Sequence, residues 1–258
     1  MASSRHVLVE KCRFQSSFTG LYSAYTDSLK VAGCHFKNLD RNGIELIRCN
    51  NPIISNNLLD SFITVGDADP IDLDVCNGGL IDGNQMYSGE YGIVITESNK
   101  SWKFKNDIVV KNNEFSNLLG ALRVNDVSRL SFFHNSIYHF ERNSYAIDIS
   151  ETDSLKFANN NIVLHNVFEG FTIDLVNDSA SLLLFDYNNI YFNNVTHPSV
   201  FLNKEIVSVD DLKNAYSVFN KRSVSFDPYF IAQFDLRTKS PSLNNAGLDV
   251  DVNADILG

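Results

Sequence analysis

The chain has 258 residues, of which 44% are hydrophobic and 20% charged, a composition that suits an ordered protein with a sizeable core and argues against disorder. Its net charge of −10, with no cluster of Lys and Arg, argues against a nucleic-acid binder. The sequence has no apolar run of about 18 residues, so no membrane-spanning segment is predicted.

The N-terminal end differs from a secretion signal, because 1–5 lacks an apolar stretch and strand-like sequence begins at once with His6–Val9. We interpret this end as the boundary of a piece cut from a longer protein. The expected localisation is secreted or cell-surface, with the signal peptide outside these residues.

A short pattern repeats along most of the chain: two apolar residues two apart, a two-residue turn, then Asn or Cys, and one further apolar residue. Its steps are 22 to 29 residues long. The Asn or Cys position is occupied in turn by Cys12, Cys34, Asn57, Asn84, Asn113, Asn135, Asn160 and Asn188. Repeats of this length, built from strands and turns, are typical of solenoids.

A second strand follows in each repeat, with inward Ile or Leu alternating with outward residues as in Gly43–Leu46 and Ala121–Val124. Two strands per repeat and no helical period predict an all-β, single-stranded right-handed parallel β-helix of about eight coils. The recurring Asn fits it, since Asn tolerates tight turns and its stacked amides can hydrogen-bond from coil to coil.

The cysteines follow the same register. Cys12 and Cys34 share one position on neighbouring coils, and Cys49 and Cys76 share another. Stacked Cα atoms would lie within disulfide range, but parallel side chains favour small buried hydrophobic residues instead. Their disulfide status stays open.

The repeat fades after Asn194, so 1–194 is predicted to form the coils and 195–258 an irregular cap of the same domain. Ser208 is expected to be the N-cap of a short helix that ends near Ser217.

The C-terminal part resembles the pectate-lyase-like β-helix superfamily. The similarity rests on 227–230 (Asp-Pro-Tyr-Phe), 234–236 (Phe-Asp-Leu), Ser240-Pro241 with Gly247, and 255–258 (Asp-Ile-Leu-Gly), together with the Asn-x-hydrophobic coils. Within that superfamily the chain looks similar to the chondroitinase B and alginate lyase group, or alternatively to uncharacterised β-helix proteins of gut Bacteroidetes. The resemblance implies the fold and a carbohydrate partner. The sequence shows no catalytic Lys or Arg motif of the lyases, so no catalytic residue of the family is assigned to this chain.

Outward positions of the second strand form one row along the coils: Tyr22, Glu45, Asp72, Val94, Arg123, Asp148 and Asp174. Three residues later a second row holds Arg48, Val75, Glu97, Asp126, Glu151 and Asn177.

Stacked like charges at Glu97, Asp126 and Glu151 repel unless something compensates, and a Ca²⁺ ion would do so. In a lyase, that ion and Arg123 would neutralise a substrate uronate beside Asp148. Arg123 is the candidate base by analogy with the family. The alternative is that the three acids simply end strands at turns.

Asp72 and Asp74 form a second candidate catalytic pair. They project from one side of a strand about 6.5 to 7 Å apart, near the carboxylate spacing of inverting glycosidases. Asp67 and Asp69 precede them on the longest inserted turn, where function tends to gather; a solvated acidic loop is the alternative.

Tyr138 and Tyr145 are candidate sugar-binding residues, as are Tyr87 and Tyr91, with half-buried packing as the alternative. His134, His139 and His165 are expected at the surface. Three functions stay open: a polysaccharide-cleaving enzyme, most plainly a Ca²⁺-assisted lyase of acidic glycan; a non-catalytic glycan-binding adhesin; and a structural segment of a surface protein. A monomer is favoured.

Overall fold

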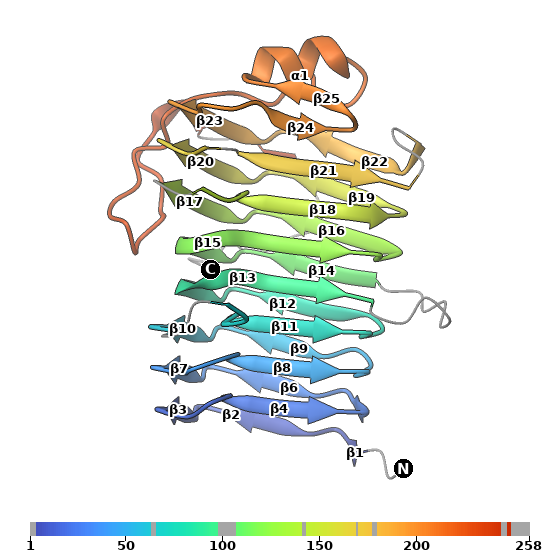
Figure 1. Ribbon diagram of the computed structural model, residues 1–258, viewed down its shortest axis with the longest axis vertical. Helices are drawn as coiled ribbons and strands as arrows, with labels where there is room; N and C mark the ends of the chain where they lie inside the picture. The colour runs from blue at the N-terminus through green and yellow to red at the C-terminus, as the bar shows by residue number, and fades with distance from the viewer. Residues whose placement is uncertain are drawn as a thin grey trace.

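The computed structural model describes residues 4–62, 66–97, 107–140, 143–168, 170–176, 180–243 and 247–248. Two sequence-based expectations, Asn177 and the tail at 255–258, lie outside these residues. The described chain winds into a β-solenoid of about seven turns, which confirms the predicted fold class (Figure 1).

Three rows of parallel strands build the solenoid. One row is an eight-stranded sheet: β2 (Leu8–Glu10), β6 (Lys30–Ala32), β9 (Ile53–Ser55), β12 (Gly79–Asp82), β14 (Asp107–Lys111), β16 (Arg129–Phe133), β19 (Leu155–Ala158) and β22 (Leu182–Asp186).

The other two rows belong to one sheet that bends at a corner. The β3–β23 face holds β3 (Arg13–Gln15), β7 (His35–Lys37), β10 (Leu58–Asp60), β17 (Ser136–Phe140), β20 (Asn161–His165) and β23 (Asn189–Asn193). The β4–β24 face holds β4 (Leu21–Ala24), β8 (Ile44–Ile47), β11 (Ile71–Asp74), β18 (Ile147–Thr152), β21 (Phe171–Leu175) and β24 (Ser199–Phe201). Two long strands, β13 (Gln85–Thr96) and β15 (Glu114–Asn125), run around the corner and contribute to both faces.

Short elements close the two ends. At the N-terminal end β1 (Ser4–Arg5) pairs with β5 (Thr26–Asp27). At the other end β25 (Lys204–Ile206) turns back antiparallel to β24, and helix α1 (Val209–Ala215) covers the last coil (Figure 1). Ser208 caps α1 as predicted, since its Oγ accepts a hydrogen bond from Asp211 N at 3.1 Å. A 3₁₀ turn at Pro241–Leu243 follows later. No helix in the described part of the chain is long and apolar enough to span a bilayer.

The predicted asparagine ladder is confirmed. Each ladder Asn accepts a hydrogen bond at Oδ1 from the backbone N–H of its counterpart one coil earlier. The series begins with Cys34 N donating to Asn57 and ends with Asn160 N donating to Asn188. Beyond the last Asn, Ser223 Oγ accepts the hydrogen bond from Asn188 N. The residue before it has a left-handed backbone in every coil, which Gly33 and Gly83 adopt without strain. The turns thereby satisfy buried backbone groups that no strand pairing reaches.

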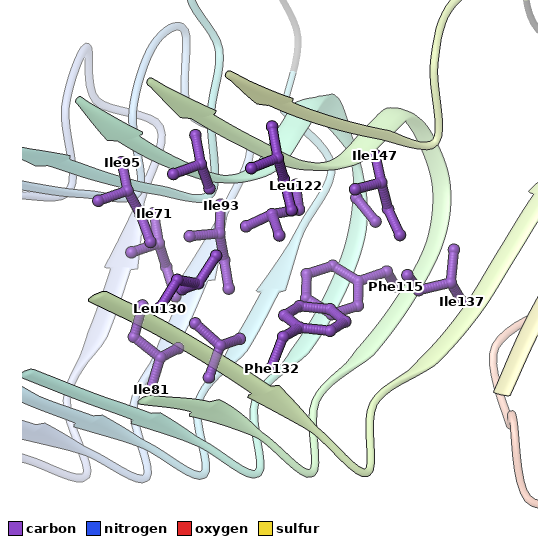
Figure 2. Packing of buried hydrophobic residues seen from close by; sticks show 14 of the residues in the cluster. Ile71, Ile81, Ile93, Ile95, Phe115, Leu122, Leu130, Phe132, Ile137 and Ile147 are labelled. Carbon is purple, nitrogen blue, oxygen red and sulfur yellow. The ribbon is translucent and has the colours of Figure 1, made fainter. Parts of the chain in front are cut away.

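Apolar side chains from all three rows fill the interior (Figure 2). Phe115, Phe132, Phe157 and Phe185 stack coil on coil, with successive ring centroids 6.3, 5.0 and 5.0 Å apart. The four cysteines are free thiols, and Cys34, Cys49 and Cys76 are buried, so these three act as the small hydrophobic residues expected. Cys12 is exposed because it lies in the first coil.

Candidate functional site

The outward row of the β4–β24 face follows the predicted order over most of its length. Strand registers place Glu45 beside Asp72, Val94 beside Arg123, and Arg123 beside Asp148.

The last member of this row differs from the prediction, because Thr172, not Asp174, lies beside Asp148. Phe171 takes the inward position opposite Ile147, which shifts the strand by two residues. A two-residue shift keeps inward and outward residues on their own sides, so the period-two pattern could not detect it.

The N-terminal part of the site centres on Arg41, from the turn before β8. Its guanidinium lies 2.7 Å from Asp67 and 3.4 Å from Glu45. Its neighbour Asn42 donates from Nδ2 to Asp72 Oδ2 at 3.0 Å. Side chains from two consecutive coils therefore meet above β8 and β11.

Asp69 lies at the inner edge of this group and is only 6% exposed. Its backbone N–H donates to Asn42 Oδ1 at 3.1 Å, and its Oδ1 accepts from Tyr91 N at 2.8 Å. The carboxyl thus links three coils in the manner of the asparagine ladder, at a position where a neutral amide would serve equally well.

The carboxyls of Asp69 and Asp72 have strongly perturbed acidities. Burial, followed by the charge of neighbouring carboxylates, raises the pKa of each to about 7. For Asp72 those neighbours include Glu45, Asp67 and Asp74, and Arg41 offsets them only in part. Both carboxyls therefore exchange a proton near neutral pH, the property that general acid–base catalysis requires.

Arg123 joins the C-terminal side of the site. Its guanidinium lies 3.9 Å from Glu90 and 3.6 Å from Asp148, and 3.7 Å from the centroid of the Tyr91 ring. Burial raises the pKa of Asp148, which Arg123 opposes. An arginine held by two carboxylates is poorly suited to act as a base, which needs a deprotonated guanidine.

Glu90 connects the two parts, because its Oε2 accepts from Asp67 N at 2.6 Å. We call the whole set the acidic network: Arg41, Asn42, Glu45, Asp67, Asp69, Asp72, Glu90, Tyr91, Arg123 and Asp148. Its six carboxyls outnumber its two guanidinium groups.

The predicted row of Glu97, Asp126 and Glu151 exists, since Thr96, Asn125 and Ser150 just before them pair in register. Asp126 and Glu151 have left-handed backbones, as residues that end a strand at a turn. Glu97 is buried whereas Glu151 is exposed. Within the described residues, no group of three or more His, Cys, Asp or Glu side chains is arranged to hold a metal ion.

The remaining candidates are Asp74, two tyrosines and the histidines. Asp74 ends β11 and accepts from Thr96 Oγ1 at 3.4 Å. Tyr138 and Tyr145 are both half-buried, and Tyr138 lies on the β3–β23 face, away from the acidic network. His139 is buried, contrary to the expectation for the histidines, and its Nε2 lies 2.9 Å from Ser144 O.

Sequence reasoning missed Arg41, Asn42 and Glu90. One signal was available for Asn42, which precedes Asp69 by 27 residues, a spacing within the range of one coil. Extending the repeat alignment one residue before each second strand would have paired the two.

Comparison with known proteins adds one finding. Residues 1–67 match the family model of the right-handed β-helix region. No curated protein and no solved structure matches the chain. The family match agrees with the observed solenoid and supports a right-handed β-helix protein.

Proposed function

We propose that this β-helix protein is a carbohydrate-active enzyme that cleaves a glycosidic bond on the β4–β24 face. The observation that carries the proposal is the outward carboxyl of Asp72, whose pKa is about 7, in one network with the exposed carboxylate of Asp67. Glycoside hydrolysis needs a carboxylic acid that is still protonated at working pH and a second carboxylate that is ionised.

The carboxyls of this network differ in access. Asp72 projects outward from β11 and can reach a bound glycan, so we assign it the role of proton donor to the leaving oxygen. Asp67, whose side chain is 60% exposed and held by Arg41, is the carboxylate placed to activate water. Asp69 is a positioning residue, because it is buried and bonded to Tyr91 N.

The excess of carboxyls favours a neutral glycan over a polyuronate on this face, since the network and the net charge of −10 both repel an anionic chain. Polysaccharides are met mainly outside the cell, so we infer secretion or display on the cell surface. Detection of the protein in culture medium or surface fractions would test that.

A Ca²⁺-assisted lyase is the second candidate, and the outward, 41% exposed side chain of Arg123 favours it. In that case the acids of the Glu97 row would hold the ion. Calcium should then raise the melting temperature of the wild type but not of Glu151→Gln.

The experiment incubates the protein with neutral and uronate-containing polysaccharides and follows both reducing ends and the ultraviolet absorbance of unsaturated products. We expect reducing ends without absorbance, and a loss of at least about 100-fold in Asp72→Asn. Asp174→Asn is the matched control, an exposed carboxylate of the same face outside the network.

Each other outcome has a clear meaning. Full activity in Asp72→Asn would contradict the assignment of the acid. Chelator-sensitive absorbance would establish the lyase instead. Binding without any cleavage would leave the non-catalytic adhesin.

A further inference from the structure

A pocket of about 420 Å³ lies on the β3–β23 face, apart from the acidic network. Its floor consists of outward side chains of β17, β20 and β23. Its outer wall is the C-terminal strap, which we define as 226–236 and which descends beside these strands (Figure 1). Pockets of 300 to 1,000 Å³ are typical of small-molecule sites.

The strap is fixed at both ends. At its start Phe226 and Asn189 exchange two hydrogen bonds of 2.8 and 2.9 Å. Near its end Ser116 Oγ donates to Gln233 O at 2.5 Å, and the Tyr87 hydroxyl donates to Phe234 O at 3.1 Å. The pocket between these anchors is therefore a built feature of the fold.

Aromatic rings form much of the pocket wall. Tyr138 and Phe140 stack with centroids 5.3 Å apart and planes 24° apart, and Phe230 of the strap stands edge-on to Tyr138 at 6.2 Å. Tyr191 and Tyr229 line the pocket too. Flat apolar rings of this kind suit the C–H surface of a pyranose.

Polar groups stand among the rings. Asn193 Nδ2 lies 2.7 Å from His165 Nδ1, so the amide and the imidazole are hydrogen-bonded across neighbouring strands. Asp227 and Gln233 add a carboxylate and an amide. The lining thus supplies both donors and acceptors for hydroxyl groups.

The charge of the lining selects the ligand. None of the residues that line the pocket is Lys or Arg, and Asp227 is acidic. We propose that this pocket binds one neutral sugar unit, stacked on Tyr138 and hydrogen-bonded through Asp227 and Gln233. It is a second carbohydrate site, independent of cleavage at Asp72.

The test is ligand-observed NMR and calorimetry with neutral monosaccharides, neutral disaccharides and glucuronate. We expect binding of at least one neutral sugar, not of glucuronate. Affinity should fall roughly tenfold in Tyr138→Ala and also in Asp227→Asn, a conservative change at the strap. Phe18→Ala, at an exposed aromatic residue of the first coil, should leave affinity unchanged.

Several results would overturn the proposal. One is the absence of binding by every neutral sugar to folded wild type; another is affinity that persists in both Asp227→Asn and a folded Tyr138→Ala. Loss of binding in Asp72→Asn alone would move the site to the acidic network. Preference for glucuronate would refute the neutral ligand.

Discussion

The asparagine ladder makes a quantitative prediction about stability at Asn113, in the middle of the solenoid. Its Oδ1 accepts from the N–H of Asn84 at 2.9 Å and from Asn84 Nδ2 at 3.0 Å. Its own Nδ2 donates to Ile81 O and to Asn135 Oδ1, each at 3.0 Å. The residue is fully buried, so water cannot replace these partners.

Substitution Asn113→Ala removes all of these side-chain bonds at once. The buried N–H of Asn84 loses its acceptor, which costs about 1–3 kcal/mol, and each further lost hydrogen bond adds about 1 kcal/mol. We expect a total of about 4–6 kcal/mol, large for a single substitution.

Urea denaturation followed by circular dichroism measures this loss as a lower midpoint at unchanged slope. The matched control is Asn125→Ala, at an exposed residue whose Nδ2 donates to Ser150 Oγ at 2.9 Å. Its cost should stay within about 0.5 kcal/mol. If Asn113→Ala costs no more than Asn125→Ala, the ladder does not stabilise the fold and our reasoning is refuted.

Three further predictions concern the core and the acidic network. Phe132→Ala, at a buried ring stacked in the core, should lower the free energy of unfolding by about 3–5 kcal/mol in urea melts, and Phe132→Leu by much less. For Asp69 the folded pKa of about 7 exceeds the ordinary value, so the stability of the wild type should fall as pH rises towards 7. Asp69→Asn should flatten this dependence and, above pH 7, raise the free energy of unfolding by about 1–2 kcal/mol relative to the wild type. Melting temperature measured against pH tests both effects. Arg123→Ala should raise the pKa of Asp148 further, because Arg123 lowers it; carboxyl ¹³C titration would show an unchanged pKa if the pair were unimportant.

The fold was predictable because a solenoid repeats one local rule. The Asn position and the inward apolar residues follow from short patterns that each coil restates, and the Ser208 cap follows from a local pattern at the start of α1. The exception at Thr172 shows the limit of such patterns. Alternation fixes which side of a sheet a residue faces, and register along the strand needs contacts that alternation does not encode.

The candidate site was only partly predictable, for a related reason. Asp72, Arg123 and Asp148 belong to a strand row and could be placed, but Arg41 reaches the site from the turn before β8 and Glu90 from the corner of β13. The pocket under the strap could not be predicted from the sequence. Its anchors join residues far apart in sequence, such as Ser116 and Gln233, outside any repeat.

The charge order along the outward row explains why Asp72 is the centre of the proposed chemistry. A parallel solenoid sets neighbours in a row one strand spacing apart, about 4.8 Å, so their charges interact directly. Within this row Arg123 separates Asp148 from the acids before it, whereas Glu45 and Asp72 are adjacent like charges, and Val94 on the other side of Asp72 offers no compensation. Arg41, on the neighbouring turn, supplies a positive charge near these two acids, but its ion pairs are with Glu45 and Asp67, not with Asp72. If residue 72 had only a structural role, a neutral side chain at this position would make the solenoid more stable. A carboxyl that must hold a proton near neutral pH, in contrast, needs the buried and acidic environment that Asp72 has.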